Sequence, residues 1–143
     1  MIYLASDYNH QWEMKKKRAD IEGRGYTVIS CWIDSPQRAA GIGGVGISDD
    51  NLAEYELCAI RDLADLDQCS EFVMFSTGEL SRGGRHTEYG YALGKKMLIH
   101  LVGPREHTFH CLPSPFMTHY PTWELFLYML DQRNTIPFPM SFR

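Results

Sequence analysis

The sequence predicts an α/β fold: a three-layer sandwich of the flavodoxin-like or Rossmann-like kind, with helices on both faces of about five parallel strands. Short apolar runs alternate along the chain with segments of helical periodicity. An apolar run at 71–75 is followed by a glycine loop, a short helix and a second run at 97–102. This succession is typical of a βαβ unit, whose loops open at the ligand-binding carboxyl edge of the sheet.

The first part of the chain alternates strand and helix. Residues 2–5 are a short apolar strand, and a polar loop leads into a helix from about Gln11 to Glu22, which two glycines end. Residues 26–33 are rich in β-branched and aromatic side chains, so they are predicted to form the second strand. A helix between two strands predicts parallel pairing through a right-handed crossover.

Glycine, proline and small residues dominate positions 34–50, which predicts a long loop of the kind that often binds ligands. The Gly-x-Gly-x-x-Gly spacing at 41–46 does not indicate dinucleotide binding, because it neither follows the first strand nor opens a helix directly. Asn51 is predicted to cap a helix that ends near Gln68. Its apolar stripe is expected to pack on the sheet and consists of Ala53, Leu57, Ile60, Leu63, Ala64 and Leu66.

The later part of the chain contains the βαβ unit and a less regular end. Glu88 is predicted in the first turn of the helix that follows the glycine loop. Prolines and histidines after residue 102 predict irregular structure up to Thr122, which can cap an amphipathic helix. An apolar, proline-punctuated tail at 136–142 can dock on its own domain or on a neighbouring subunit.

Composition narrows the classes of function. The 143 residues predict one domain, spanning 1–143, and a net charge of −4 argues against nucleic-acid binding. No apolar run approaches a membrane span, and the N-terminus lacks the basic region of a signal peptide, so a cytoplasmic location is expected. The four cysteines are widely spaced and are interpreted as buried free thiols of a reducing compartment.

Metal binding is not expected. His107, His110 and Cys111 are suitable zinc ligands, but a fourth ligand at motif spacing is missing.

Glu88 is the strongest candidate for chemistry. A carboxylate at a helix start faces the positive end of the helix dipole, which keeps it ionised. At the carboxyl edge of a sheet such a group can attack a sugar anomeric centre, because the transition state is cationic and the resulting ester is cleavable. Stabilisation of the helix start is the alternative interpretation, and on the residues alone both stay open.

A family resemblance favours the nucleophile. The stretches that carry it are residues 2–5, residues 61–63, Gly84 to Lys95 with an E-x-G-x-A core, and residues 109–113 with 122–124. In this order they cover most of the chain, and the chain resembles the nucleoside 2-deoxyribosyltransferase superfamily. That superfamily includes the transferases and the related deoxynucleoside 5′-monophosphate N-glycosidases.

The resemblance implies roles for individual residues. Glu88 takes the place of the family nucleophile, which attacks the anomeric carbon of deoxyribose. Asp62 matches an aspartate that positions the sugar or the nucleophile, and Tyr3 matches a strand tyrosine near the nucleophile in some transferases. Gly90 and Ala92 are expected to let the helix lie close to the sheet because they are small.

The chain departs from the family where the base is handled. Transferases carry an aspartate six residues before the nucleophile, and Arg82 stands there in this sequence. The acid that protonates the leaving base is therefore unassigned, with Asp7, Glu79 and His86 as possible substitutes.

The phosphate site departs as well. The monophosphate glycosidases hold phosphate with a serine- and glycine-containing loop after the first strand, whereas this chain has Ser6 and then Asp7, which repels phosphate. A possible anion cradle lies ahead of Glu88, beside a helix N-terminus, and consists of Ser81, Arg82, Gly83, Gly84 and Arg85.

The resemblance implies N-glycosidic bond cleavage and transfer on (deoxy)nucleosides through a glutamate nucleophile. Two alternatives remain: a nucleoside 5′-monophosphate N-glycosidase, and a non-catalytic nucleotide-binding module. The expected partner is a small nucleoside or nucleotide, with neither nucleic acid nor membrane, and no cofactor is needed. A homodimer or higher homo-oligomer is expected from the family and from the apolar tail.

Overall fold

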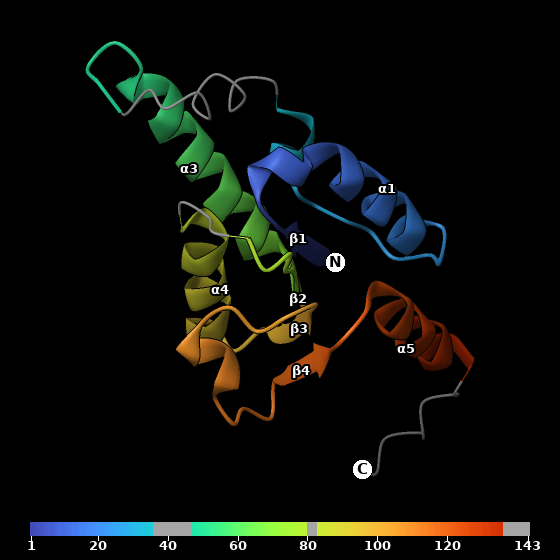
Figure 1. Cartoon of the computed structure of the whole chain (residues 1–143). Helices are drawn as coiled ribbons and strands as arrows, with labels where there is room; N and C mark the ends of the chain where they lie inside the picture. The colour runs from blue at the N-terminus through green and yellow to red at the C-terminus, as the bar shows by residue number, and fades with distance from the viewer. Residues whose placement is uncertain (36–46, 80–82, 136–143) are drawn as a thin grey trace, which may run out of the picture.

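A parallel sheet forms the centre of the computed structural model, which describes residues 1–35, 47–79 and 83–135 (Figure 1). Its four strands follow the order β1-β2-β3-β4, and every pairing is parallel. The predicted α/β fold is confirmed, and the described residues form four strands where about five were expected. The strands are β1 (Ile2–Ala5), β2 (Glu71–Phe75), β3 (Leu98–Val102) and β4 (Met117–Tyr120).

Helices cover both faces of the sheet. In Figure 1, α1 and α5 lie on one side of the strands, and α3 and α4 lie on the other. The helices are α1 (Gln11–Glu22), α3 (Leu52–Gln68), α4 (Gly84–Gly94) and α5 (Trp123–Thr135), with short 3-10 helices η1 (Tyr8–His10), η2 (Cys31–Asp34) and η3 (Thr108–Cys111).

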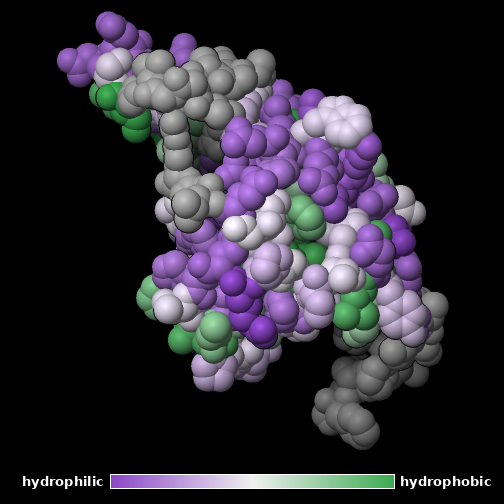
Figure 2. Space-filling view, viewed as in Figure 1, coloured by the Kyte–Doolittle hydropathy of each residue, from purple (hydrophilic) through white to green (hydrophobic). Residues whose placement is uncertain are grey.

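The core lies between the sheet and its helices. All four residues of β1 are buried, as parallel strands covered on both faces require. Met14 and Ile21 of α1 and Phe126 of α5 fill one side, and Tyr89 and Ala92 of α4 lie on the other. The outer surface seen in Figure 2 is mostly hydrophilic, with small separate apolar patches.

The predicted strand at 26–33 is not a strand. Only Val28 forms a β-bridge, to Ile2, and η2 begins three residues later. The backbone leaves the sheet after two hydrogen bonds, from the Ile2 N–H to the Thr27 carbonyl and from the Ile29 N–H to the Ile2 carbonyl, both of 2.9 Å.

Side chains continue the ladder where the backbone stops. The Leu4 N–H donates to the Ser30 hydroxyl oxygen at 2.7 Å, and the Trp32 indole N–H donates to the Leu4 carbonyl at 2.8 Å. Both polar groups of Leu4 therefore have partners on the outer side of β1 without a neighbouring strand. This is the physical reason why a β-rich segment need not be extended here.

The apolar stripe predicted to bury α3 faces away from the body. Leu57, Ile60 and Leu63 are 44%, 56% and 45% exposed. Of the predicted stripe only Leu66 is buried, so the prediction is wrong for most of its members.

A buried polar contact explains why the predicted apolar stripe of α3 faces outward. The carboxylate of Asp65, itself buried, accepts hydrogen bonds from the Cys31 N–H at 2.7 Å and from its thiol at 3.5 Å. This contact ties α3 to η2 through a polar face, which hydrophobic periodicity does not register.

The region predicted to be irregular before Thr122 contains η3 and β4. β4 pairs with β3 from the Ile99–Met117 pair to the Val102–Tyr120 pair. Prolines lie before this strand and directly after it, so they bound the strand without interrupting its ladder.

Several predictions lie outside the described residues. They concern the glycine-rich loop at 36–46, Ser81 and Arg82 of the anion cradle, and the tail at 136–142. Within the described ranges, no helix has the length and hydropathy needed to cross a bilayer.

The expected burial of the cysteines is wrong. Cys31 and Cys111 are exposed, and Cys58 and Cys69 are partly exposed.

Candidate active site

The carboxyl ends of β1, β2 and β3 meet the start of α4. Gly83 precedes this helix with φ 94°, a conformation that favours glycine. Gly84 is the first helical residue and is exposed.

Glu88 is the fifth residue of α4 and lies in its second turn; the first turn holds no acidic residue. The prediction that free amides at the helix start keep Glu88 ionised is therefore wrong. Support comes from Tyr3 instead, whose hydroxyl donates a 2.7 Å hydrogen bond to Glu88 Oε1. This bond joins β1 to α4, 85 residues apart in the sequence, and brings two predicted site residues together.

The Tyr3 hydroxyl is held firmly in place. Tyr3 has no exposed surface, and its ring stacks on Phe72 with 5.9 Å between centroids and 5° between planes. The ring of Phe72 in turn lies beside that of Tyr89 of α4, with 6.4 Å between the ring centroids. Because the ring is fixed by packing, its hydrogen bond also restricts the Glu88 carboxylate.

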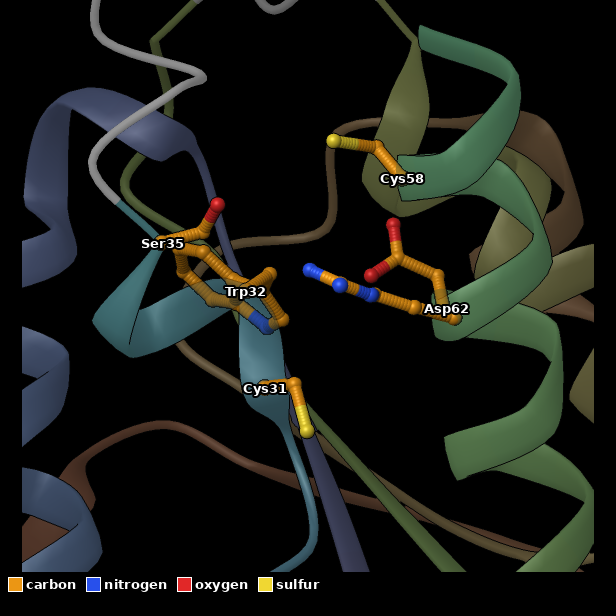
Figure 3. Close-up of a pocket in the computed structure, with 6 residues that line it drawn as sticks. Cys31, Trp32, Ser35, Cys58 and Asp62 are labelled. Carbon is orange, nitrogen blue, oxygen red and sulfur yellow. The ribbon is translucent and has the colours of Figure 1, made fainter. Parts of the chain in front are cut away.

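Asp62 lines a hollow between α3 and η2. The hollow encloses about 240 Å³, counting space open to solvent, and its other lining residues are Cys31, Trp32, Ser35, Cys58 and Arg61. In Figure 3, Cys58 and Asp62 project from α3 toward Trp32 and Ser35 of the opposite wall. The expected role of Asp62, to orient Glu88 or a sugar hydroxyl, stays a prediction.

Ser6 and Asp7 follow β1 and take part in local structure. The Ser6 hydroxyl donates to the Phe75 carbonyl at 3.0 Å. Asp7 caps η1, where its side chain accepts from the Asn9 N–H at 3.0 Å.

Arg85 lies inside the protein with its charge balanced by carboxylates. Its side chain is 1% exposed, and Nη2 donates to Glu106 Oε2 and to the Glu79 carbonyl, each at 2.7 Å. Its Nη1 lies 3.7 Å from Asp7 Oδ2. The anion-cradle prediction is therefore wrong for Arg85, since its guanidinium is turned inward.

Glu106, which no sequence motif marks, is the main partner of Arg85. Burial raises the pKa of Glu106, but contacts with Ser76, the Gly78 amide and the Arg85 charge outweigh this and lower it overall. The Gly78 N–H donates to Oε1 at 2.6 Å. The one sequence feature that could have indicated Glu106 is its position shortly after a buried strand, since ligands usually bind at the carboxyl edge of a parallel sheet.

Three histidine rings gather beside Glu106. The ring of His86 lies 5.5 Å from that of His107 and 5.4 Å from that of His110. Burial and the Arg85 charge lower the pKa of His86, and burial together with the His86 charge lowers that of His110 to about 4. Both rings are therefore neutral at pH 7, and His86 is a weak proton donor there.

The other predicted substitutes for the base-handling acid are also engaged. Glu79 binds His10, with 3.1 Å between Oε2 and Nε2, and its side chain is 65% exposed.

The two small residues of α4 differ in their packing. Gly90 is exposed, and a Cβ there would meet nothing within 4 Å, so its predicted packing role is wrong. Ala92 is fully buried, which confirms the role expected for that residue.

Metal ligands do not cluster in the described part of the chain: no group of three or more His, Cys, Asp or Glu side chains there could hold an ion.

Comparison with known proteins identifies a shared fold. No protein-family model matches the chain, and no curated protein matches it. Among solved structures, the chain is similar to the CMP N-glycosidase BcmB of Clostridium botulinum, with a TM-score of 0.55 and 19% sequence identity. The match covers 92% of this chain and 98% of the glycosidase. The two proteins therefore share an α/β fold over almost their whole lengths.

Proposed function

We propose that this protein cleaves the N-glycosidic bond of a nucleoside or nucleotide, with Glu88 as the nucleophile. The observation that carries the proposal is the hydrogen bond between β1 and α4 from the buried Tyr3 hydroxyl to Glu88. The family resemblance of the E-x-G-x-A segment and the fold shared with a CMP N-glycosidase support it.

The chemistry follows from a restrained carboxylate. A Glu88 oxygen attacks the anomeric carbon and forms a glycosyl ester, while the bond to the base nitrogen breaks and its electron pair leaves with the base. The base takes a proton from a general acid or from water. The positive charge that develops on the sugar is stabilised by the anionic carboxylate, and Tyr3 limits the movement of that group.

The second step decides between transfer and hydrolysis. Attack on the anomeric carbon by another base releases Glu88 and gives a new nucleoside, whereas attack by water gives the free sugar. Because the structural neighbour is a CMP N-glycosidase, hydrolysis of a nucleoside monophosphate is the second candidate. Incubation of a nucleoside with a free acceptor base separates the two, because only a transferase forms the exchanged product.

Asp62 is proposed to orient a sugar hydroxyl or Glu88 from the hollow between α3 and η2. Its half-buried position on α3, and the presence of Arg61 and Ser35 among the residues that line that hollow, support this role. Further site residues proposed from the sequence are Ser81, Arg82 and Gly84.

The decisive experiment is to trap the intermediate. Wild-type protein is incubated with nucleosides and 5′-monophosphates, and with a slow-hydrolysing analogue, and the adduct is located by peptide mass spectrometry. We expect a glycosyl group on Glu88 and a fall in turnover of about a thousandfold or more in Glu88→Gln. Glu54→Gln, in the exposed first turn of α3, is the matched control and should keep wild-type turnover.

A non-catalytic nucleotide-binding module is the outcome that contradicts the proposal. In that case the wild type turns over no nucleoside or nucleotide, while wild type and Glu88→Gln bind one with equal affinity by calorimetry.

We further propose that the chain forms a homodimer or higher homo-oligomer in a reducing cytoplasm. The exposed leucine and isoleucine side chains of α3 and the four free cysteines support this. A monomer in sedimentation at micromolar concentration contradicts the oligomer.

A further inference from the structure

Arg85 joins three loops that leave the sheet at its carboxyl edge. Nη2 binds the Glu79 carbonyl in the loop after β2 and the Glu106 carboxylate in the loop after β3. Nη1 lies within ion-pair distance of Asp7 in the loop after β1. A single guanidinium therefore connects the chain segments that surround the start of α4.

The same residue lies one helical turn before Glu88. Arg85 is the second residue of α4 and Glu88 the fifth, so the two are separated by three positions on a rigid hydrogen-bonded helix. Fixing Arg85 against the loops therefore fixes the axial position and rotation of the segment that carries Glu88. Tyr3 acts on the Glu88 carboxylate itself, from β1.

Stability alone does not account for a buried arginine here. Removing a guanidinium from water carries a large cost, and well-packed apolar residues in its place are often neutral or stabilising. Arg85 Nε and Nη1 are buried and have no hydrogen-bond partner among the protein groups, so pairing offsets that cost only in part. The contacts of Arg85 with three loops are therefore better explained by placement of those loops than by a gain in stability.

We propose that Arg85 is a positioning residue for the nucleophile. It holds the start of α4 in register with the loops after β1, β2 and β3, so that Glu88 lies within reach of the anomeric carbon. This inference rests on the proposed function, since it assigns to Arg85 the placement of that nucleophile.

The test compares Arg85→Met and Arg85→Lys with Arg133→Met. Arg133 is a suitable control because its Nη1 also donates to a carboxylate, that of Glu71, at 2.7 Å, far from Glu88 on another helix. For each variant we measure the free energy of unfolding, kcat, KM and the rate of glycosyl adduct formation on Glu88.

We expect Arg85→Met to lower kcat and the adduct rate by about 30- to 100-fold, because a displacement of about 1 Å costs this much, with KM changed less than about threefold. Arg85→Lys keeps the charge, folds more readily and should recover part of the rate. Arg133→Met should lose stability while its folded fraction keeps kcat within about twofold.

Equal kcat in the two methionine variants, after correction for the folded fraction, overturns the inference and leaves the proposed function intact. If Arg85→Met does not fold, an Arg85→Lys variant with wild-type kcat and adduct rate overturns it as well. Absence of turnover and of adduct in the wild type contradicts the proposed function and this inference together.

Discussion

Two ionic clusters lie at opposite ends of the sheet, and they differ in the segments of the chain that they connect. The amino-end cluster consists of Glu71, His100 and Arg133, and the carboxyl-edge cluster consists of Asp7, Arg85 and Glu106. In the first, Glu71 Oε2 accepts from Arg133 at 2.7 Å and contacts His100 at 2.9 Å, while Arg133 and His100 are 3.4 Å apart.

The carboxyl-edge cluster is centred on one arginine. Arg85 has two close hydrogen bonds and one longer ion pair, and each cluster contains buried nitrogens without a hydrogen-bond partner among the protein groups: Nε and Nη1 of Arg85, and Nδ1 of His100. It also connects three loops, whereas the amino-end cluster connects two adjacent strands to α5. A cluster that joins neighbouring strands to a helix is expected to stabilise the fold, and a cluster that joins three loops at the carboxyl edge of a parallel sheet is expected to serve the site.

The largest expected difference comes from removal of each carboxylate charge. Glu106→Gln leaves the buried Arg85 charge poorly compensated, so we expect a loss of about 3 kcal/mol in the free energy of unfolding and a fall in kcat. Glu71→Gln should destabilise the protein too, but the folded fraction should retain wild-type kcat. Denaturant titration and turnover at matched folded fraction measure both, and equal kcat in the two variants would remove the functional distinction.

The second difference concerns acid stability at the amino end. Burial raises the pKa of Glu71, but hydrogen bonds from His100 and Arg133 outweigh this and bring it to about 2, below the usual 4.5. A lowered folded-state pKa gives stability that is present above pH 4.5 and lost as the pH falls toward 2. With allowance for solvent screening, we expect a loss on the order of 2 kcal/mol that Glu71→Gln abolishes.

The carboxyl edge should also lose stability on acidification, but in a less acidic pH range than the amino end. Burial, with the His86 charge, lowers the pKa of His110 from 6.5 to about 4. The unfolded chain therefore binds the proton first, and stability is lost as the pH falls from 6.5 toward 4, again by about 2 kcal/mol. The charged or titratable groups that bear on His110 are His86 and Arg85 of α4, and Glu106 and His107 of the loop after β3.

His110→Asn tests this window directly. The His110 ring accepts the Glu106 N–H through Nδ1, and an asparagine oxygen can replace that acceptor without titrating. The free energy of unfolding, measured from about pH 7 to about pH 5, should depend less on pH in this variant, and its pH dependence should stay unchanged in Glu71→Gln. An unchanged slope in His110→Asn contradicts the assignment.

The smallest effect is expected from the loss of a tyrosine–carboxylate hydrogen bond, and two such bonds in the described part of the chain can be compared. Tyr3 is buried and binds Glu88 at 2.7 Å, and Tyr91 binds Asp67 at 2.6 Å near the surface. Tyr3→Phe removes the restraint on the proposed nucleophile, so we expect kcat to fall about tenfold, the equivalent of one charge-assisted hydrogen bond. Tyr91→Phe should leave kcat unchanged in the same steady-state assay; a similar fall in both would assign the effect to the packing of α4.

Local patterns predicted the elements that carry strong periodicity. Residues 2–5 and 71–75 form strands, the second apolar run forms β3 over Leu98–Val102, and the first helix has the predicted bounds. Each of these depends on short-range sequence: apolar runs, glycine stops and helical spacing. The E-x-G-x-A segment likewise placed Glu88 on α4 beside the sheet.

Long-range polar contacts were beyond the reach of such patterns. The pairing of Arg85 with Glu106 joins residues 21 positions apart and has no periodic signature. The anchoring of α3 through Asp65 turned an apparently core-facing stripe outward. In both cases one buried polar bond outweighed the average hydrophobic preference of a helix or loop.

The side-chain ladder on β1 has a consequence for the behaviour of the protein in concentrated solution. β1 is the outermost strand of the sheet, and an open edge strand can recruit strands from other molecules. Ser30 and Trp32 occupy the polar groups of Leu4, so this edge offers little to an incoming backbone. Two side chains thus protect the sheet against edge-to-edge aggregation, a task that other proteins give to a terminal strand or a charged residue.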